Sequence, residues 1–298
     1  MVKSPAALPA ELENLDQGHG KLPGTDPRNR LNDLSSNEWV RETVSVWTQK
    51  GLGLNHPHAQ IERLHPAPFS FTDISRLVRF FTKKGAMVLD PFVGVGSSLK
   101  ACALEERSGL GIELNHWYVD LARQRLALEI PADIRSLTSQ TIIQGDARDV
   151  LKGLPDNMAD FVVTSPPYSN ILHKQDHKAK QERVSLGLDT DYGVDPRDLG
   201  NIEEYQDFLK EVATILGECG RVLKPRKYMA VIVSDFRHKS KYVMYHADLA
   251  NELEASCLEL RGITVLFQPQ KRVFPYGYPY AYVPNVHHQY ILLLQNMK

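Results

Sequence analysis

The chain has 298 residues, of which 42% are hydrophobic and 24% are charged, and its formal net charge is -1. This composition is typical of a globular protein, and the near-neutral charge excludes a protein that coats nucleic acid with its whole surface. No apolar run reaches the roughly 18 to 20 residues of a membrane span, and the N-terminus lacks the basic flank and apolar block of a signal peptide. Cys102, Cys219 and Cys257 have no metal-type spacing. We therefore expect a cytoplasmic protein with reduced thiols, no metal site and no membrane partner.

The first predicted elements are an arm and a helix. Residues 1–30 are rich in Pro, Gly, Asp and Asn and have no periodicity, which predicts a flexible arm ahead of a single domain over residues 31–298. The sequence Ser-Ser-Asn-Glu at 35–38 is typical of a helix start. Trp39 and Trp47 follow at near-helical spacing, so we expect one helix that packs both tryptophans on the main domain.

From residue 71 onward, helical and strand patterns alternate as in a doubly wound α/β sheet. The predicted helices cover residues 71–82, 97–106, 116–130, 203–223 and 246–259. The predicted strands cover residues 86–89, 109–112, 141–144, 161–164, 228–234, 263–268 and 288–294. Because the last two strands form a hairpin, we expect a seven-stranded mixed sheet with an antiparallel edge strand and helices on both faces.

Two long segments interrupt this alternation. Residues 169–201 are polar, charged and without periodicity, and compact domains seldom carry so long a loop without a use for it. Residues 269–287 form an aromatic and proline-rich loop between the last two strands. We expect both segments to be insertions that contact the substrate.

A glycine-containing turn follows the strand at 86–89 and opens the next helix, where α/β sheets bind nucleotide-like ligands. Gly94 and Gly96 permit tight turning, and the helix start offers unpaired N–H groups. The third glycine that dinucleotide enzymes use at pyrophosphate is replaced by Leu99. The carboxylate of Asp90 would repel pyrophosphate but suits a ligand that carries an amino group and a sulfonium charge.

Acidic residues also stand at the ends of the next two predicted strands. Glu113 lies about twenty residues after the turn, where a carboxylate can accept hydrogen bonds from both hydroxyls of a ribose. Asp146 precedes Ala147 and is placed to receive the exocyclic amine of an adenine ring. A single carboxylate at a strand end is common on protein surfaces, but three at successive strand ends favour a cofactor site.

The strand at 161–164 ends in the sequence Ser-Pro-Pro-Tyr at 165–168. In their order along the chain, the glycine turn, Glu113, Asp146 and this corner resemble the S-adenosylmethionine-dependent DNA methyltransferases that modify exocyclic amino groups. The segment 65–69, His-Pro-Ala-Pro-Phe, is similar to the one that precedes the glycine turn in this family and helps enclose the cofactor. The cofactor motifs come first here, whereas many relatives are circularly permuted.

The resemblance implies a class I methyltransferase (Rossmann-like) fold with S-adenosylmethionine as its cofactor. The cofactor-binding residues that it implies are Phe69, Asp90, Pro91, Phe92, Gly94, Gly96, Ser97, Ser98, Glu113, Asp146 and Ala147.

It also implies that Ser165, Pro166, Pro167 and Tyr168 are catalytic. In that interpretation the Ser165 side chain and the Pro166 carbonyl accept hydrogen bonds from the target amine, and Tyr168 stacks on the base. Acceptors draw the conjugated lone pair back toward the nitrogen, while the prolines fix the backbone and add no donors. The base must be flipped out of the duplex to reach this corner.

The residue before the two prolines bears on the substrate. In the family, serine accompanies mostly N4-cytosine transfer, and aspartate or asparagine mostly N6-adenine transfer. We therefore expect an enzyme of class EC 2.1.1 that methylates the N4 of cytosine in DNA, as in restriction-modification. N6-adenine DNA methylation, RNA base methylation and a catalytically silent nucleic-acid-binding subunit are the open alternatives. The expected setting is the nucleoid of a bacterial, archaeal or phage type, with double-stranded DNA as partner and a homodimer or a cognate nuclease left open.

Three local features could supply contacts with DNA phosphates. The loop at 169–201 contains Lys174, and residues 221–241 gather seven lysines and arginines against one acid. Lys271 and Arg272 begin the aromatic loop, where basic residues beside aromatic ones can touch phosphates and stack on bases. We predict that Lys174, Arg272, Tyr276 and Tyr278 contact DNA.

Overall fold

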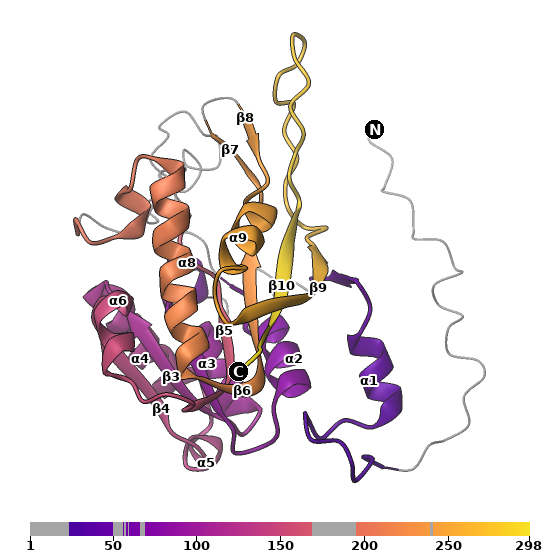
Figure 1. The fold of residues 1–298 in the computed structure, drawn as a ribbon, viewed down its shortest axis with the longest axis vertical. Helices are drawn as coiled ribbons and strands as arrows, with labels where there is room; N and C mark the ends of the chain where they lie inside the picture. The colour runs from indigo at the N-terminus through magenta and orange to yellow at the C-terminus, as the bar shows by residue number, and fades with distance from the viewer. Residues whose placement is uncertain are drawn as a thin grey trace.

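The computed structural model of the protein describes residues 24–49, 56, 58, 60–65, 69–168, 195–238 and 241–298. The centre of this described part is an eight-stranded sheet with the strand order β1-β9-β10-β6-β5-β2-β3-β4 (Figure 1). Its strands are β1 (Val46–Thr48), β2 (Met87–Asp90), β3 (Ser108–Glu113), β4 (Gln140–Gln144), β5 (Ala159–Thr164), β6 (Leu223–Val233), β9 (Leu258–Phe267) and β10 (His288–Asn296). Neighbouring strands are parallel except for the two pairs that β10 makes, with β6 and with β9.

The sheet confirms the α/β class but has eight strands where the sequence predicted seven. The additional strand is β1, which pairs in parallel with β9. Helix α1 (Ser36–Glu42) begins with the predicted capping box between Ser35 and Glu38 but ends before Trp47. Trp47 lies in β1 and is only 4% exposed. The single helix predicted over Trp39 and Trp47 is therefore wrong: it combines a short helix with a short edge strand. The near-helical spacing arose because both elements pack an aromatic side chain on the same core.

The position of the antiparallel strand also differs from the prediction. β10 lies between β6 and β9 and not at the edge of the sheet. It carries three side chains, Ile291, Leu292 and Leu294, that are at most 1% exposed, whereas β9 has four exposed residues, at positions 259–261 and 263. A strand that is covered on both faces must be apolar on both, so β10 takes the interior position.

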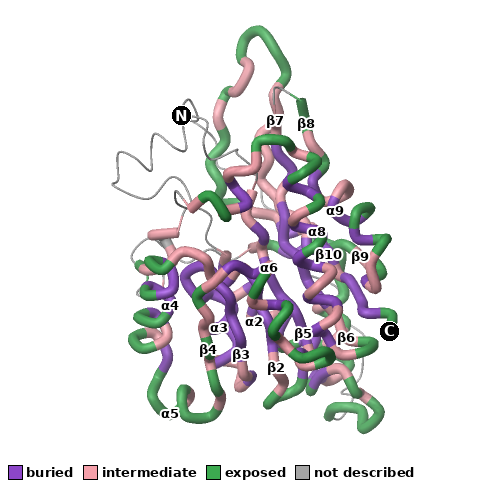
Figure 2. Tube along the Cα trace, turned by 60° about the vertical axis from the view of Figure 1, so that its left-hand side comes forward, coloured by how far each residue is buried: buried purple, intermediate pink, exposed green. Residues whose placement is uncertain are grey.

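Helices cover both faces of the sheet, and the buried strands run between them (Figure 2). The main helices are α2 (Phe71–Phe81), α3 (Ser97–Leu104), α4 (His116–Glu129), α8 (Tyr205–Val222) and α9 (Tyr245–Leu253). Phe161 and Val163 of β5 pack with α2 and α3, whereas Val162 packs with α8 and α9. This burial on both faces explains why β5 reads as a continuous apolar run.

Short elements complete the described fold. They are η3 (Glu62–Leu64), α5 (Ala132–Arg135), α6 (Ala147–Val150), η4 (Leu151–Gly153), η6 (Leu199–Asn201), β7 (Phe236–His238) and β8 (Lys241–Val243). β7 and β8 form a separate antiparallel pair where the sequence predicted no strands. Across the residues that are described, no helix is both long and apolar enough to cross a membrane.

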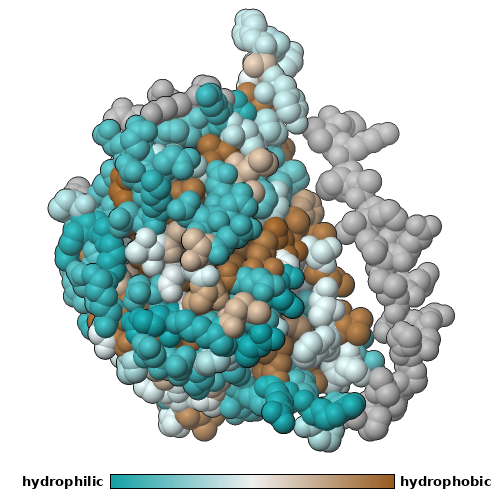
Figure 3. Space-filling view, in the orientation of Figure 1, coloured by the Kyte–Doolittle hydropathy of each residue, from teal (hydrophilic) through white to brown (hydrophobic). Residues whose placement is uncertain are grey.

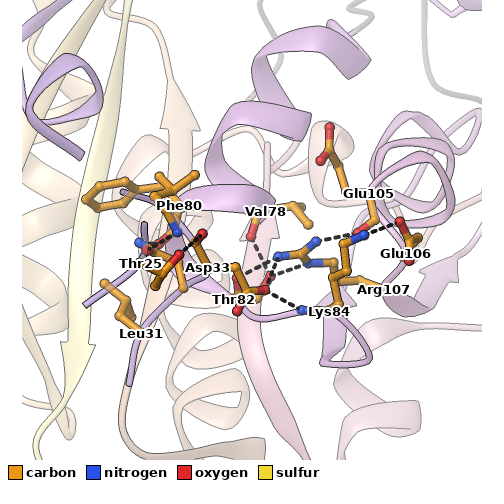
Figure 4. A network of polar contacts seen from close by, with 12 residues as sticks. Thr25, Leu31, Asp33, Val78, Phe80, Thr82, Lys84, Glu105, Glu106 and Arg107 are labelled. Carbon is orange, nitrogen blue, oxygen red and sulfur yellow. Dashed lines mark hydrogen bonds and ion pairs between the residues drawn. The ribbon is translucent and has the colours of Figure 1, made fainter. Parts of the chain in front are cut away.

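A polar network fastens the start of the described chain to the body (Figure 4). Arg107 is 2% exposed and donates to the Thr82 hydroxyl at 2.9 Å and to the Thr82 carbonyl at 2.7 Å. The Asp33 carboxylate accepts from the Lys84 N–H at 3.1 Å, and the Asp33 carbonyl accepts from the Thr25 hydroxyl at 2.8 Å. These bonds hold residues 25–33 against the end of α2. The part of the predicted arm before residue 24 lies outside the described residues, and the domain boundaries stay predictions.

Candidate active site

A cavity of about 490 Å³ lies at the carboxyl ends of β2, β3, β4 and β5. These parallel strands are neighbours, so residues that follow them meet at one edge of the sheet. The cavity brings together ten of the residues predicted for the site: Pro91, Phe92, Gly94, Glu113, Asp146, Ala147, Ser165, Pro166, Pro167 and Tyr168. Phe69, Asp90, Ser97 and Ser98 line a smaller neighbouring cavity of about 40 Å³ that Ser165 also borders.

Asp90 joins the glycine turn to the strand that carries the predicted catalytic corner. Its Oδ1 accepts from the Thr164 hydroxyl at 2.6 Å and from the Phe92 N–H at 3.0 Å, and its Oδ2 accepts from the Ser98 hydroxyl at 2.5 Å. Burial raises the pKa of Asp90, although these three hydrogen bonds oppose the shift. The carboxylate therefore holds β2, α3 and β5 in register, and its direct contact with a cofactor stays a prediction.

The glycine turn has the backbone that only glycine adopts readily. Gly94 and Gly96 have φ values of 51° and 80°, and Gly96 is the N-cap residue of α3. A Cβ atom at Gly96 would lie 3.1 Å from the Cβ of Ala122. Both glycines therefore allow left-handed turning, and Gly96 also allows α3 to approach α4 closely.

Glu113 at the end of β3 has both oxygens engaged by backbone donors. Oε2 accepts from the Gly94 N–H at 2.9 Å, and Oε1 accepts from the Asn115 N–H at 2.8 Å. Burial raises the pKa of Glu113 to about 7, and the negative charges of Asp198 and Asp90 add to the rise. Because burial makes ionisation of Glu113 costly, additional hydrogen-bond donors, such as the two hydroxyls of a ribose, would stabilise its ionised form.

Asp146 at the end of β4 forms a two-pronged ion pair with Arg148. The guanidinium donates to Asp146 Oδ2 at 2.6 Å and Oδ1 at 3.0 Å, and it also reaches the Arg197 carbonyl at 2.8 Å and Glu211 at 3.3 Å. Burial acts to raise the pKa of Asp146, but hydrogen bonds from Arg148 outweigh it and lower the pKa. Asp146 is thus kept ionised as an acceptor, and Arg148 was not recognised in the sequence because no motif marks it.

The predicted catalytic corner follows β5 and opens into the large cavity. Ser165, Pro167 and Tyr168 are partly buried, and Pro166 is buried. The Tyr168 hydroxyl accepts from Gln289 Nε2 at 3.5 Å. Burial raises the pKa of Tyr168, and hydrogen bonds from Gln289, the Ser234 backbone and the Ser165 side chain oppose the shift. The corner is therefore held by the start of β10 and the end of β6.

A second cluster of functional groups lies on this side of the corner. Asp235, which follows β6, is 4% exposed and contacts His246 Nδ1 at 2.7 Å and the Tyr242 hydroxyl at 3.2 Å. The His246 ring stacks on Tyr290 with 3.7 Å between ring centres. A carboxylate at this distance from Nδ1 fixes the orientation of the imidazole ring. The sequence did not reveal this pair, because its members come from separate elements.

Residues 62–65, here named the strap, lie over the glycine turn, and the sequence indicated only His65 among them. His65 lines both cavities, and its ring packs edge-on against Tyr118 at 4.8 Å. The preceding turn η3 is anchored by Glu62, which pairs at 2.6 Å with the fully buried Arg125. Arg125 also donates to the Ser97 hydroxyl at 2.7 Å and so connects the strap to α3.

The predicted DNA contacts are distributed unevenly. Lys174 lies outside the described residues, and Arg272 and Tyr278 are exposed in the loop between β9 and β10. Tyr276 is partly buried and packs against Phe274 at 5.5 Å between ring centres.

The basic segment at 221–241 is divided by the fold. Arg221 pairs with Asp156 and Glu218, and Lys224 pairs with Asp160. These three acids neutralise basic residues at the end of α8 and the start of β6, which is the end of that strand far from the corner. In the described ranges no three His, Cys, Asp or Glu side chains gather as a metal site.

Comparisons with known proteins bear on this site. Residues 9–124 match a family model described as DNA methylase, and the match includes the glycine turn and Glu113 but ends before Asp146 and the corner. The type II methyltransferase M.MthZI of Methanothermobacter thermautotrophicus is 32% identical over 90 residues, which are 30% of this chain and 24% of that protein. M.ScaI of Streptomyces caespitosus is 26% identical over 129 residues, 43% of this chain and 41% of that protein.

The chain thus spans well under half the length of these relatives. The solved structure of a SAM-dependent methyltransferase from Aquifex aeolicus aligns with 81% of this chain and with 100% of its own, at 16% identity and a TM-score of 0.44. The family match and the relatives confirm the resemblance to DNA amino-methyltransferases that was drawn from the sequence. S-adenosylmethionine is the cofactor that this resemblance implies.

Proposed function

We propose that this chain, as an S-adenosylmethionine-dependent DNA amino-methyltransferase, transfers a methyl group to the N4 amine of a cytosine flipped out of duplex DNA. One observation carries the proposal. The Ser-Pro-Pro-Tyr corner at 165–168 borders the same cavity as Glu113 and Asp146. Groups suited to a ribose and an adenine therefore lie within one cavity with groups suited to an amine.

The residues of the large cavity fit S-adenosylmethionine. Its volume of about 490 Å³ lies within the range of ligand sites. Glu113 would receive the ribose hydroxyls and Asp146 the adenine amine, while Gly94 lets the backbone approach closely. When bound, S-adenosylmethionine supplies a methyl group on a positively charged sulfur.

The corner acts on the amine through hydrogen-bond acceptors. The Ser165 hydroxyl has two lone pairs, and these and the Pro166 carbonyl would accept from the two N–H groups of the amine. Because neither proline has an N–H, the corner adds no donor that would favour a carbonyl over an amine at this position. Asp90, through Thr164, keeps these acceptors at a fixed distance from the glycine turn.

The choice of cytosine rests on Ser165, and N6-adenine is the alternative base. Both bases present an exocyclic amine with two N–H groups, so the acceptors described above suit either one. Double-stranded DNA is the proposed partner, and Arg272 in the loop between β9 and β10 is the proposed phosphate contact. Both relatives are type II methyltransferases, which suggests the modification half of a restriction system.

The test is nucleoside mass spectrometry of DNA from a host that lacks its own DNA methyltransferases, with and without the gene. N4-methylcytosine supports the proposal, N6-methyladenine moves the substrate to adenine, and neither modification contradicts DNA methylation. In the last case, calorimetry with S-adenosylmethionine separates a silent subunit, which would not bind it, from an enzyme with another substrate such as RNA. The Ser165→Ala protein is the matched control and should leave the DNA with less of the modified base.

A further inference from the structure

The loop between β9 and β10 ends in a segment of unusual composition. This segment, residues 273–285, is here named the hairpin tip. None of its thirteen residues is Asp, Glu, Lys, Arg or His, and four of them are tyrosines. The hairpin rises clear of the rest of the described chain (Figure 1), and its surface is pale in hydropathy where the charged body is strongly hydrophilic (Figure 3). A projection without charged side chains has no ion pair to offer to phosphates.

The hairpin tip is internally fixed. The Asn285 side chain pairs with both backbone groups of Phe274, receiving the N–H at 2.9 Å and donating to the carbonyl at 2.8 Å. The Gly277 carbonyl accepts from the N–H groups of Tyr280 and Ala281, both at 2.7 Å. These bonds close a compact turn, so its side chains are presented without a further ordering cost.

Three of the four tyrosines point outward. Tyr278, Tyr280 and Tyr282 are 82%, 94% and 88% exposed. Exposed aromatic side chains gathered on one projection mark a binding surface. Tyrosine in particular combines a flat face for stacking with a hydroxyl that tolerates water, so it suits a partner made of stacked rings in water.

The base of the hairpin adjoins the catalytic corner. β10 begins at His288, and Gln289 contacts the Tyr168 hydroxyl. Tyr290 is in register with Val233, the last residue of β6, so the hairpin leaves the sheet at the carboxyl ends of β5 and β6. Ten residues, 268–277, lead from the end of β9 into the hairpin tip. A segment of this length can extend by at most about 33 Å, which is enough to reach from the corner into a groove of a duplex.

We propose that Tyr280 and Tyr282 form a stacking wedge that enters the DNA helix beside the target base and holds the opened stack. The inference rests on the proposed function and deepens it. Lys271 and Arg272 at the base of the hairpin would contact phosphates, and the hairpin tip would contact bases only. The alternative occupant of the hairpin tip, a second copy of this chain, is an outcome of the test below.

The experiment compares the wild-type protein with the double variants Tyr280→Ala/Tyr282→Ala and Tyr280→Phe/Tyr282→Phe. Closed circular plasmid is relaxed by a topoisomerase in the presence of each protein at matched occupancy, and its topoisomers are then separated. A wedge between base pairs unwinds the helix, so the wild type should shift the distribution. The alanine variant should keep less than about half of that shift, and the phenylalanine variant, which retains both ring faces, should keep it all.

The topoisomer distribution can be measured without knowledge of the recognition sequence and without methyl transfer. It is therefore separate from the test of the proposed function. Salt titration of binding should give the same slope for all three proteins, because no phosphate contact is removed. In methylation assays the alanine variant should lose activity on duplex DNA and keep it on single strands. An equal topoisomer shift for all three proteins would overturn the wedge. So would a smaller sedimentation coefficient for the alanine variant alone, which would assign the hairpin tip to a contact between copies.

Discussion

Substitution of Glu113 by glutamine provides a direct test of the cofactor site. Burial holds the pKa of Glu113 at about 7, and both of its oxygens face donors. If only the ionised carboxylate accepts two ribose hydroxyls, the apparent Kd is multiplied by one plus the ratio of the proton concentration to the acid dissociation constant. This factor is about 11 at pH 6 and about 1.1 at pH 8. The wild-type protein should therefore bind about tenfold more weakly at pH 6 than at pH 8.

The affinity should increase with pH because the pKa of Glu113 is raised. The pKa of Glu113 is raised by burial, so the group is largely protonated below pH 7, and a ligand that needs the anion must first remove the proton. Affinity is then gained as the pH rises through 7 and is constant above about pH 8. Glu113→Gln cannot ionise, and its affinity should be flat over the same range and about ten- to a hundredfold below the wild-type value at pH 8.

The assay is isothermal titration calorimetry with 5′-methylthioadenosine, which carries the adenine and the ribose but no amino acid. S-adenosylmethionine is less suitable, because its own α-amino group titrates near pH 8. His65 and His116 also border the cavity and are retained in Glu113→Gln. A tenfold pH dependence that persists in Glu113→Gln would assign the effect to those histidines and refute the role of Glu113. An affinity of the wild type that is flat from pH 6 to pH 8 would refute it as well.

Four further substitutions test the corner, the strap and the glycine turn. Ser165→Ala removes one acceptor and should lower kcat at least about tenfold in steady-state assays while the Kd for S-adenosylmethionine stays unchanged; an unchanged kcat would contradict the catalytic assignment. Glu62→Gln removes one of the two carboxylate partners of the buried Arg125, which keeps Glu129, so calorimetric unfolding should show a loss of about 2 kcal/mol, and a wild-type Tm would show that the strap is not anchored there. Gly96→Ala and Gly85→Ala both place a side chain at a φ near 80°, which costs about 1 to 2 kcal/mol, and only Gly96→Ala should also weaken cofactor binding.

The residues at the strand ends were predictable because they depend on local chemistry. Glu113 and Asp146 follow apolar strands, and parallel strands deliver their ends to one edge of the sheet whatever the rest of the fold does. Their partners were not predictable. Arg148 is one of many surface arginines in the sequence, and its place between Asp146 and the Arg197 carbonyl depends on how residues 195–201 return to the sheet.

The tyrosines of the aromatic loop show the same limit. Composition predicts that the loop contacts the substrate, but it does not show which of the four tyrosines point outward, so the prediction of Tyr276 and Tyr278 carried no information on side-chain direction. The turn closed by Gly277 and Asn285 packs Tyr276 inward and leaves Tyr280 and Tyr282 outward. Side-chain direction in such a loop is set by backbone hydrogen bonds that no periodic pattern encodes.

The sequence by itself determined the alternation of strands and helices, the glycine turn, the acidic strand ends and the Ser-Pro-Pro-Tyr corner, because each follows from a short run of residues and its backbone preferences. Only the tertiary structure decided where β1 and β10 lie in the sheet, that Asp90 links the corner to the glycine turn, and that Asp235 and His246 meet beside Tyr168. These relations join residues far apart in the chain, and they depend on which apolar faces are buried together. Burial also sets the pKa of Glu113, a property that the residue type alone leaves near 4.5.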